Sequence, residues 1–182
     1  MEWVLLAIVV AIVLYGVVTY NGLVSLRQRV TQAFADIDVQ LKQRHDLIPN
    51  LVETVKGYAT HERETLDSVT RARAAAESAS GPADQAAKEN VLTQTLRSLI
   101  AVSEAYPDLK ANQNFLSLQE ELSATEGRIA YARQYYNDAV QRYNTKIQSF
   151  PAVLIAGALR FQEREYFEAD DTSRGPVNVS FS

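Results

Sequence analysis

The chain has 182 residues and a net charge of −4, and its few Gly (7) and Pro (5) residues fit long helices better than a sheet protein with many turns. It contains no cysteine, which excludes disulfides and thiolate metal sites. Basic and acidic residues alternate along the chain without forming a basic stripe, so nucleic acid is not an expected partner.

The N-terminal stretch from Trp3 to Tyr20, WVLLAIVVAIVLYGVVTY, carries no charge. As a helix it would be ~27 Å long, enough to cross the hydrocarbon core of a bilayer. Trp3 and Tyr20 stand at its ends, where amphipathic rings favour the membrane interface. A cleaved signal peptide would have a basic start and a small-x-small cleavage site, but the chain begins Met1-Glu2 and leaves the stretch as VTYN. Residues 1–20 are therefore predicted to be an uncleaved transmembrane anchor.

The charges that flank this stretch predict its orientation. No Lys or Arg precedes it, whereas Arg27, Arg29, Lys42 and Arg44 follow it. Positive charges near a span stay on the cytoplasmic side. We therefore expect a single-pass protein of the cell membrane, with its N-terminus outside and its large domain in the cytoplasm.

Four segments beyond the anchor show apolar residues at helical spacing: Leu23–Leu41, Ile48–Ala76, Val91–Val102 and Phe115–Phe150. In the last one, three- and four-residue steps continue without a break, which is typical of a helix seam in a bundle. The connections are short, which favours antiparallel neighbours. The prediction is an all-α fold, with an antiparallel four-helix bundle over residues 21–150. The anchor precedes it, and an apolar segment with an extended C-terminal tail follows over 151–182.

The predicted helix ends depend on turn and capping residues. Asp46 is expected to cap the second helix, with Pro49 in its first turn, where a missing N–H costs little. The later ends are predicted at the sequence SASGP (78–82), at Tyr106-Pro107, at Asn112 as a cap, and at Phe150-Pro151.

Three long motifs give a resemblance. They are DVQLKQRHDLIPNLVETVKGYATHE (38–62), EAYPDLKANQNFLSLQEEL (104–122) and TEGRIAYARQYYNDAVQRYN (125–144), and with Tyr20-Asn21 they closely resemble the LemA family of bacterial membrane proteins. The resemblance implies an antiparallel four-helix bundle behind one membrane helix. It implies little about activity, which is largely undefined for the family. Some relatives are associated with magnetosome membranes, which hints at membrane organisation.

The residues offer no recognisable catalytic or metal site. Neither His45 nor His61 completes the Glu-x-x-His motif of bundle di-metal centres, and HERET (61–65) lacks the second histidine of a zincin. Nucleophile elbows and glycine-rich phosphate loops are also missing. We therefore expect no cofactor and no enzyme activity, and interpret the chain as a non-enzymatic scaffold or adaptor. The alternative is a hydrolase or ligand-binding regulator whose site is built from dispersed residues.

The predicted winding brings two turns together at the end of the bundle that is distal to the bilayer. A protein partner, or a second copy of the chain, is predicted to dock there, on His45, Asp46, Asn50, Tyr106, Asp108, Lys110 and Asn114. The alternative is that these residues only cap helices and close turns.

At the other end, the second helix is expected to be ~10 residues longer than the first, or ~15 Å, and so to bring Arg71 and Arg73 towards the lipid headgroups. The alternative is a bend at Asn21-Gly22 that tilts the bundle away. The apolar stretch 152–159 (AVLIAGAL) either lies in the membrane interface or packs over the open end of the bundle. Tyr136-Asn137 and Tyr143-Asn144 are seven residues apart and so share a helix face. Asn21 is expected to hydrogen-bond to Asn144 and fix the helix register. The alternative is a ligand site at this layer.

Overall fold

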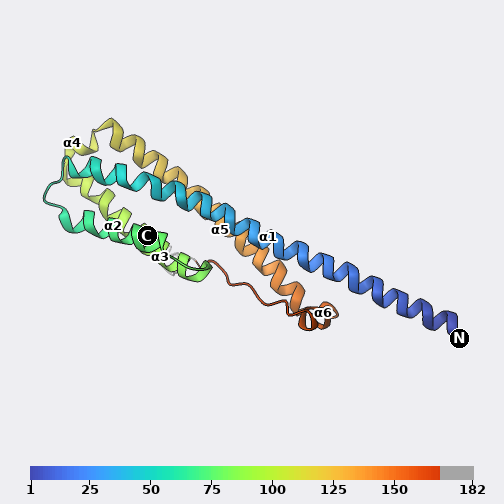
Figure 1. The fold of residues 1–182 in the computed structure, drawn as a ribbon. Coiled ribbons are helices and arrows are strands. Elements are labelled where there is room, and N and C mark those ends of the chain that lie inside the picture. Colours follow the sequence, from blue (N-terminus) through green and yellow to red (C-terminus); the bar gives the residue numbers. More distant parts are fainter. Residues whose placement is uncertain (169–182) are drawn as a thin grey trace, which may run out of the picture. The chain divides into compact units, whose positions relative to one another are not determined.

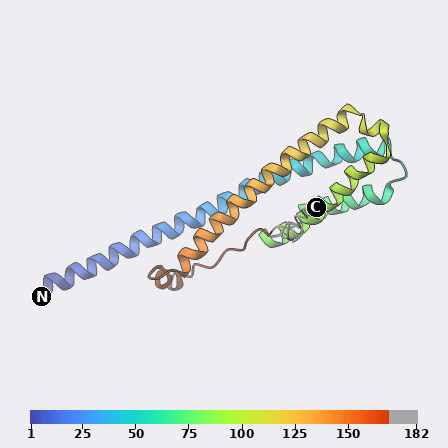
Figure 2. The same cartoon turned by 180° about the vertical axis from the view of Figure 1, so that it is seen from behind.

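The computed structural model describes residues 1–168. Within this range the regular structure is helical: α1 Glu2–Lys56, α2 Arg63–Glu77, α3 Pro82–Val102, the short 3₁₀ turn η1 Ser103–Ala105, α4 Pro107–Lys110, α5 Gln113–Gln148 and α6 Ala152–Ala158 (Figures 1 and 2). The predicted all-α class is confirmed. The end of the predicted C-terminal tail, residues 169–182, lies outside the described residues.

The first predicted turn is wrong. Helix α1 continues through Asp46 and Pro49 to Lys56, so residues 44–46 lie inside a helix, and the turn comes at 57–62 instead. Pro49 has no N–H to donate, which leaves the carbonyl of His45 without its helical partner. Arg73 of α2 replaces that donor, because its Nε lies 2.9 Å from this carbonyl oxygen. A long-range contact thus lets the helix pass a residue that the local pattern treats as a helix start.

The later helix ends lie where the sequence predicts them. Gly81 precedes Pro82, the first residue of α3, with a φ of 81°, a left-handed conformation that glycine adopts without strain. Asn112 caps α5, since its Oδ1 accepts the N–H of Phe115 at 3.0 Å. α5 ends shortly before Pro151.

The described residues divide into two compact units, and α1 and α5 contribute to each. Unit 2 holds residues 39–130, with Phe167 and Glu168. Its four main helical segments are the end of α1, α2, α3 and the start of α5, joined by short connections. Its buried core contains Ile48, Leu51, Val55, Leu66, Val69, Leu92, Leu96, Leu99, Phe115 and Leu122. The helices of this unit differ from the four predicted ones, because α1 contains the first predicted helix together with the start of the second, and α2 holds the rest of the second.

Unit 1 holds residues 1–38 and 131–166. It is made of the first part of α1, the second part of α5, α6 and the extended stretch 161–166. Its seam buries Leu23, Val30, Ala33 and Ile37 of α1 and Tyr136, Val140, Tyr143 and Ile147 of α5. Phe34 and Tyr136 pack against each other with tilted rings, whose centroids are 5.6 Å apart.

The N-terminal part of α1 has a different surface. Its apolar side chains are exposed from Trp3 (82%) to Val18 (70%). Among the described helices, α1 is the one that is long and apolar enough to cross a membrane, judged by length and composition. An exposed apolar helix of this length is a candidate membrane anchor.

Candidate functional site

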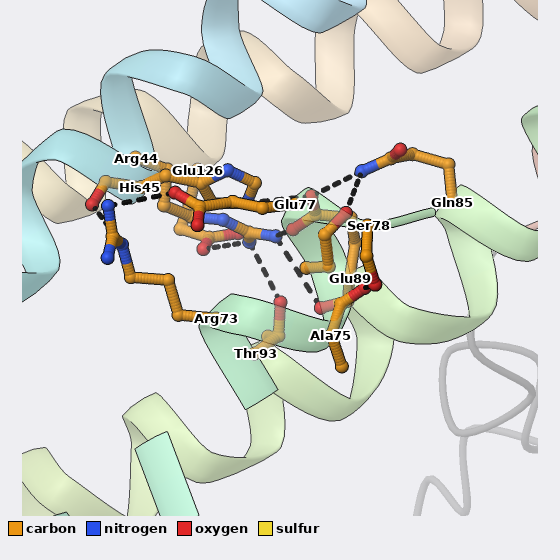
Figure 3. A network of polar contacts seen from close by, with 11 residues as sticks. Arg44, His45, Arg73, Ala75, Glu77, Ser78, Gln85, Glu89, Thr93 and Glu126 are labelled. Atoms are coloured by element: carbon orange, nitrogen blue, oxygen red, sulfur yellow. Dashed lines mark hydrogen bonds and ion pairs between the residues drawn. The ribbon is translucent and has the colours of Figure 1, made fainter. Parts of the chain in front are cut away.

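A buried polar cluster centred on Arg44 lies in unit 2 (Figure 3). Arg44 is 1% exposed, and its guanidinium forms ion pairs with Glu89 of α3 and Glu126 of α5. Its Nη1 also donates to the hydroxyl of Thr93 at 2.9 Å. One side chain of α1 is thereby tied to two other helices.

Glu89 is the acceptor at the middle of this cluster. Its carboxylate also accepts a hydrogen bond from the Nε2 of Gln85 at 2.7 Å and lies 2.9 Å from the Nε2 of His45. Gln85, Glu89 and Thr93 are spaced four residues apart on α3, and Arg44 and His45 are neighbours on α1. One face of α3 therefore contacts a short stretch of α1.

The electrostatics of the cluster keep Glu89 ionised. Burial by itself would raise the pKa of the Glu89 carboxyl. The hydrogen bond with His45 and the positive charge of Arg44 outweigh burial, so the pKa of Glu89 lies below its ordinary value. A charged carboxylate then faces a permanently charged guanidinium out of contact with water.

The cluster's polar groups are nearly all engaged with one another. Among the described residues, the Nε of Arg44 is the buried side-chain nitrogen that lacks an acceptor. Within the same range, no group of three His, Asp or Glu side chains is arranged to hold a metal ion. The ion pairs of Arg44 with Glu89 and Glu126 connect α1 to α3 and α5.

Open grooves run along the surface of unit 2. One, of about 560 Å³, is lined by residues between Val52 and Thr70. A second, of about 490 Å³, lies between α2 and α3 and is lined mostly by polar side chains. A third, of about 290 Å³, lies between α3 and α5 and includes Thr93 and Glu126 of the cluster. The buried cluster thus reaches the surface through Glu126, whose side chain is 37% exposed.

The predicted docking residues differ in their exposure to solvent. His45 is 6% exposed and its ring faces Glu89, so its placement in an exposed turn is wrong. Asp46 and Asn50 are exposed on α1, and Asp46 pairs with Lys42 at 3.2 Å. These three residues lie inside the helix because α1 passes Pro49.

The other four predicted docking residues follow the end of α3. Tyr106 is half-buried and donates its hydroxyl to Glu62 at 3.2 Å. Asp108, Lys110 and Asn114 are exposed, and Lys110 pairs with Glu104 at 2.6 Å. In unit 2 this region also meets the α1–α2 connection, because Asn112 donates to the hydroxyl of Tyr58 at 2.8 Å.

The predicted membrane-interface residues have different environments. Trp3 and Tyr20 are exposed on α1, at 82% and 44%. Arg71 is exposed on α2, whereas Arg73 is engaged with the His45 carbonyl and with Glu77 at 2.8 Å. The expectation of a long second helix is wrong, since α2 has 15 residues. The approach of Arg71 and Arg73 to the headgroups stays a prediction.

The tyrosine and asparagine side chains of α5 hold the extended stretch 161–166. Tyr136 donates to the carbonyl of Glu165 at 2.8 Å, and Tyr143 donates to that of Gln162 at 3.0 Å. Asn144 forms a reciprocal pair with the backbone N–H and carbonyl of Arg164, each at 2.9 Å. The expected Asn21–Asn144 bond is therefore wrong. Asn144 binds the backbone of Arg164 instead, in an extended stretch that reasoning from helix faces does not consider.

Comparison with known proteins shows the family of this chain. The model of the LemA family matches residues 33–181. Protein LemA of Metamycoplasma hominis is 25% identical over 161 residues, covering 88% of this chain and 74% of that protein. Magnetosome protein MamQ 2 of Paramagnetospirillum magneticum is 24% identical over 195 aligned residues, covering 93% of this chain and 72% of that protein. Because the family match extends over most of its length, the chain belongs to the LemA family.

Proposed function

We propose that this protein is a membrane-anchored, non-enzymatic scaffold or adaptor. The observation that carries the proposal is the N-terminal part of α1, where large apolar side chains are exposed from Trp3 to Val18. An apolar helix exposed all round is stable in a lipid environment, where its backbone groups are satisfied within the helix. The anchor is a single pass that leaves the N-terminus outside and the bundle in the cytoplasm, on the strength of Arg27 and Arg29 after the span.

The non-enzymatic part of the proposal is supported by the cluster around Arg44. Its guanidinium, the Glu89 carboxylate and the His45 ring are used in contacts with one another. A general base or nucleophile needs a side chain that can reach a substrate. These groups instead serve to hold the helices of unit 2 together.

Asp108, Lys110 and Asn114 are exposed, and we assign partner contact to this end of unit 2.

The chain has no cysteine, so single-cysteine labelling tests the orientation without background. Glu2→Cys places a thiol before the span, and Ser117→Cys places one on the exposed surface of α5. In intact cells an impermeant maleimide should label the first variant and spare the second. Both should react after permeabilisation. Labelling of Ser117→Cys alone in intact cells would overturn the orientation.

Site-specific crosslinking in cells tests the adaptor role. A photoreactive amino acid at Asp108 should give discrete adducts with a protein partner or a second copy of the chain. The same amino acid at Glu120, an equally acidic exposed position on α5, is the matched control. Identical adduct patterns at the two positions would count against docking at this end of the bundle.

A further inference from the structure

Helix α6 points its small residues inward and its large apolar residues outward. Ala152 and Ala156 are 1% and 2% exposed, whereas Leu154 is 65% exposed. Phe150, just before the helix, is 81% exposed, and Leu159, just after it, is 53% exposed. A helix whose role was to close the end of a bundle would bury its large apolar side chains. The outward face of α6 therefore calls for an apolar partner.

The position of α6 within unit 1 indicates what that partner is. Phe161, close after α6, packs edge-on against Tyr20 of α1 with ring centroids 6.1 Å apart. Arg27, about two turns further along α1, lies over the same ring at 5.3 Å from its centroid. Tyr20 is the last residue of the uncharged stretch, so these contacts hold the end of α6 at the level where the candidate span ends.

The charges of this region have the sign that a phospholipid surface attracts. Residues 21–30 and 141–164, all in unit 1, contain one acidic residue, Glu163, although the whole chain has a net charge of −4. The basic residues in these two stretches are Arg27, Arg29, Arg142, Lys146, Arg160 and Arg164. Basic side chains next to an apolar face are typical of helices that lie on anionic membranes.

Arg160 occupies an unusual backbone position. It follows α6 with a φ of 56°, and the N–H of Phe161 returns to the carbonyl of Ala156 at 2.9 Å. This is the left-handed helix stop at which glycine is usual, since other residues are strained there. The long basic side chain of Arg160 thus follows the exposed Leu159, at a position where a glycine would be less strained.

We propose that α6, with Phe150 and Leu159, is a second membrane contact: an interfacial helix that lies on an anionic leaflet beside the span of α1. The proposal rests on the proposed membrane anchorage. It adds that unit 1 contacts the bilayer at two places. The span of α1 is one contact, and α6, which follows α5, is the other. The apolar side chains enter the interface, and the neighbouring basic residues remain among the headgroups.

The full chain in vesicles of phosphatidylcholine and phosphatidylglycerol provides the test. An environment-sensitive fluorophore is attached to one cysteine at a time, in the variants Leu154→Cys, Val10→Cys and Tyr131→Cys. Val10 lies within the span, and Tyr131 is a solvent control on α5 that is 74% exposed. Lipids with a nitroxide on the acyl chain quench a fluorophore that enters the membrane. Circular dichroism checks that each variant keeps its helices.

The expected result is strong quenching at positions 10 and 154, several-fold above that at 131. Quenching at 10 with no more at 154 than at 131 would overturn the second contact and leave the anchorage intact. Absence of quenching at all three positions would overturn the anchorage and the second contact together. Vesicles of phosphatidylcholine alone should reduce quenching at 154 and spare position 10, and an unchanged signal at 154 would overturn the anionic preference.

Discussion

Arg44 and Glu89 are the most consequential pair at the scale of single residues. They are 1% and 3% exposed, so each would be strongly destabilising without the other. Replacement of both by apolar residues would cost little by comparison, since removing two charges from water offsets much of their attraction. Their value lies in specificity, because an arginine on α1 fits where α3 and α5 present carboxylates.

Arg44→Met keeps most of the side-chain volume but leaves Glu89 buried without its cation. We expect the free energy of unfolding to fall by about 3 kcal/mol, measured by denaturant titration of the detergent-solubilised chain with helical circular dichroism as the signal. Lys42→Met removes an exposed pair with Asp46 and should cost no more than about 0.5 kcal/mol. Equal costs for the two variants would contradict the assigned role of Arg44.

The lowered pKa of Glu89 makes stability depend on pH in a defined direction. A carboxyl whose folded-state pKa lies below its ordinary 4.5 binds protons more weakly when folded. Its stabilising contribution is therefore complete above that value and is lost as the pH falls through the folded-state pKa. The melting temperature should therefore fall as the pH is lowered below 4.5, and it should fall less steeply in Glu89→Gln. Glu120→Gln, at an exposed position, should leave the slope unchanged.

At the scale of an element, α1 depends on a contact from another helix. The carbonyl of His45 lacks its helical donor at Pro49, and Arg73 supplies one at 2.9 Å. Pro49→Ala restores the helical N–H, after which Arg73 has no unpaired carbonyl to serve. Arg73→Ala should therefore cost about 1 kcal/mol more in the wild-type background than in Pro49→Ala. A denaturation double-mutant cycle measures this difference, and a coupling energy of zero would contradict the compensation.

The stretch 161–166 is an element held by side chains of α5. In the wild type, the N–H of Arg164 donates to the Oδ1 of Asn144 at 2.9 Å. Asn144→Ala should accelerate hydrogen exchange of that amide by about tenfold, the effect of one lost hydrogen bond. Asn144→Asp keeps the acceptor and should have a smaller effect. Tyr135→Phe, on the exposed side of α5, should have none.

For the whole molecule, the decisive property is that α1 takes part in two compact units and also carries the apolar N-terminal stretch. Val10→Asp places a charge at the middle of the stretch, at a cost of about 3 kcal/mol in a bilayer. We expect alkaline carbonate to release a larger fraction of Val10→Asp than of the wild type from membranes. Val91→Asp, at a position of α3 that is 53% exposed, should remain in the membrane pellet as the wild type does.

Local sequence signals determined several features of this protein. The 3-4 spacing of apolar residues in α5 predicted a seam that is buried from Phe115 to Ile147, with Leu118 half-buried and only Phe150 exposed. Gly81, Asn112 and Pro151 marked helix limits because turn and capping preferences act within a few residues of the chain. The apolar, uncharged composition of residues 3–20 likewise needs no tertiary contact to identify a candidate span.

The tertiary structure alone decided which distant residues pair. Arg44 and Glu126 are 82 positions apart, and Pro49 is tolerated inside α1 because Arg73, on another helix, reaches the carbonyl that it leaves free. Asn144 was singled out correctly by its helix face, but its partner Arg164 lies on an extended stretch with no periodicity to reveal it. Periodicity shows which face of a helix is buried. The partner of a polar group depends on which distant segment the fold brings beside that face, and this is fixed only when the whole core packs.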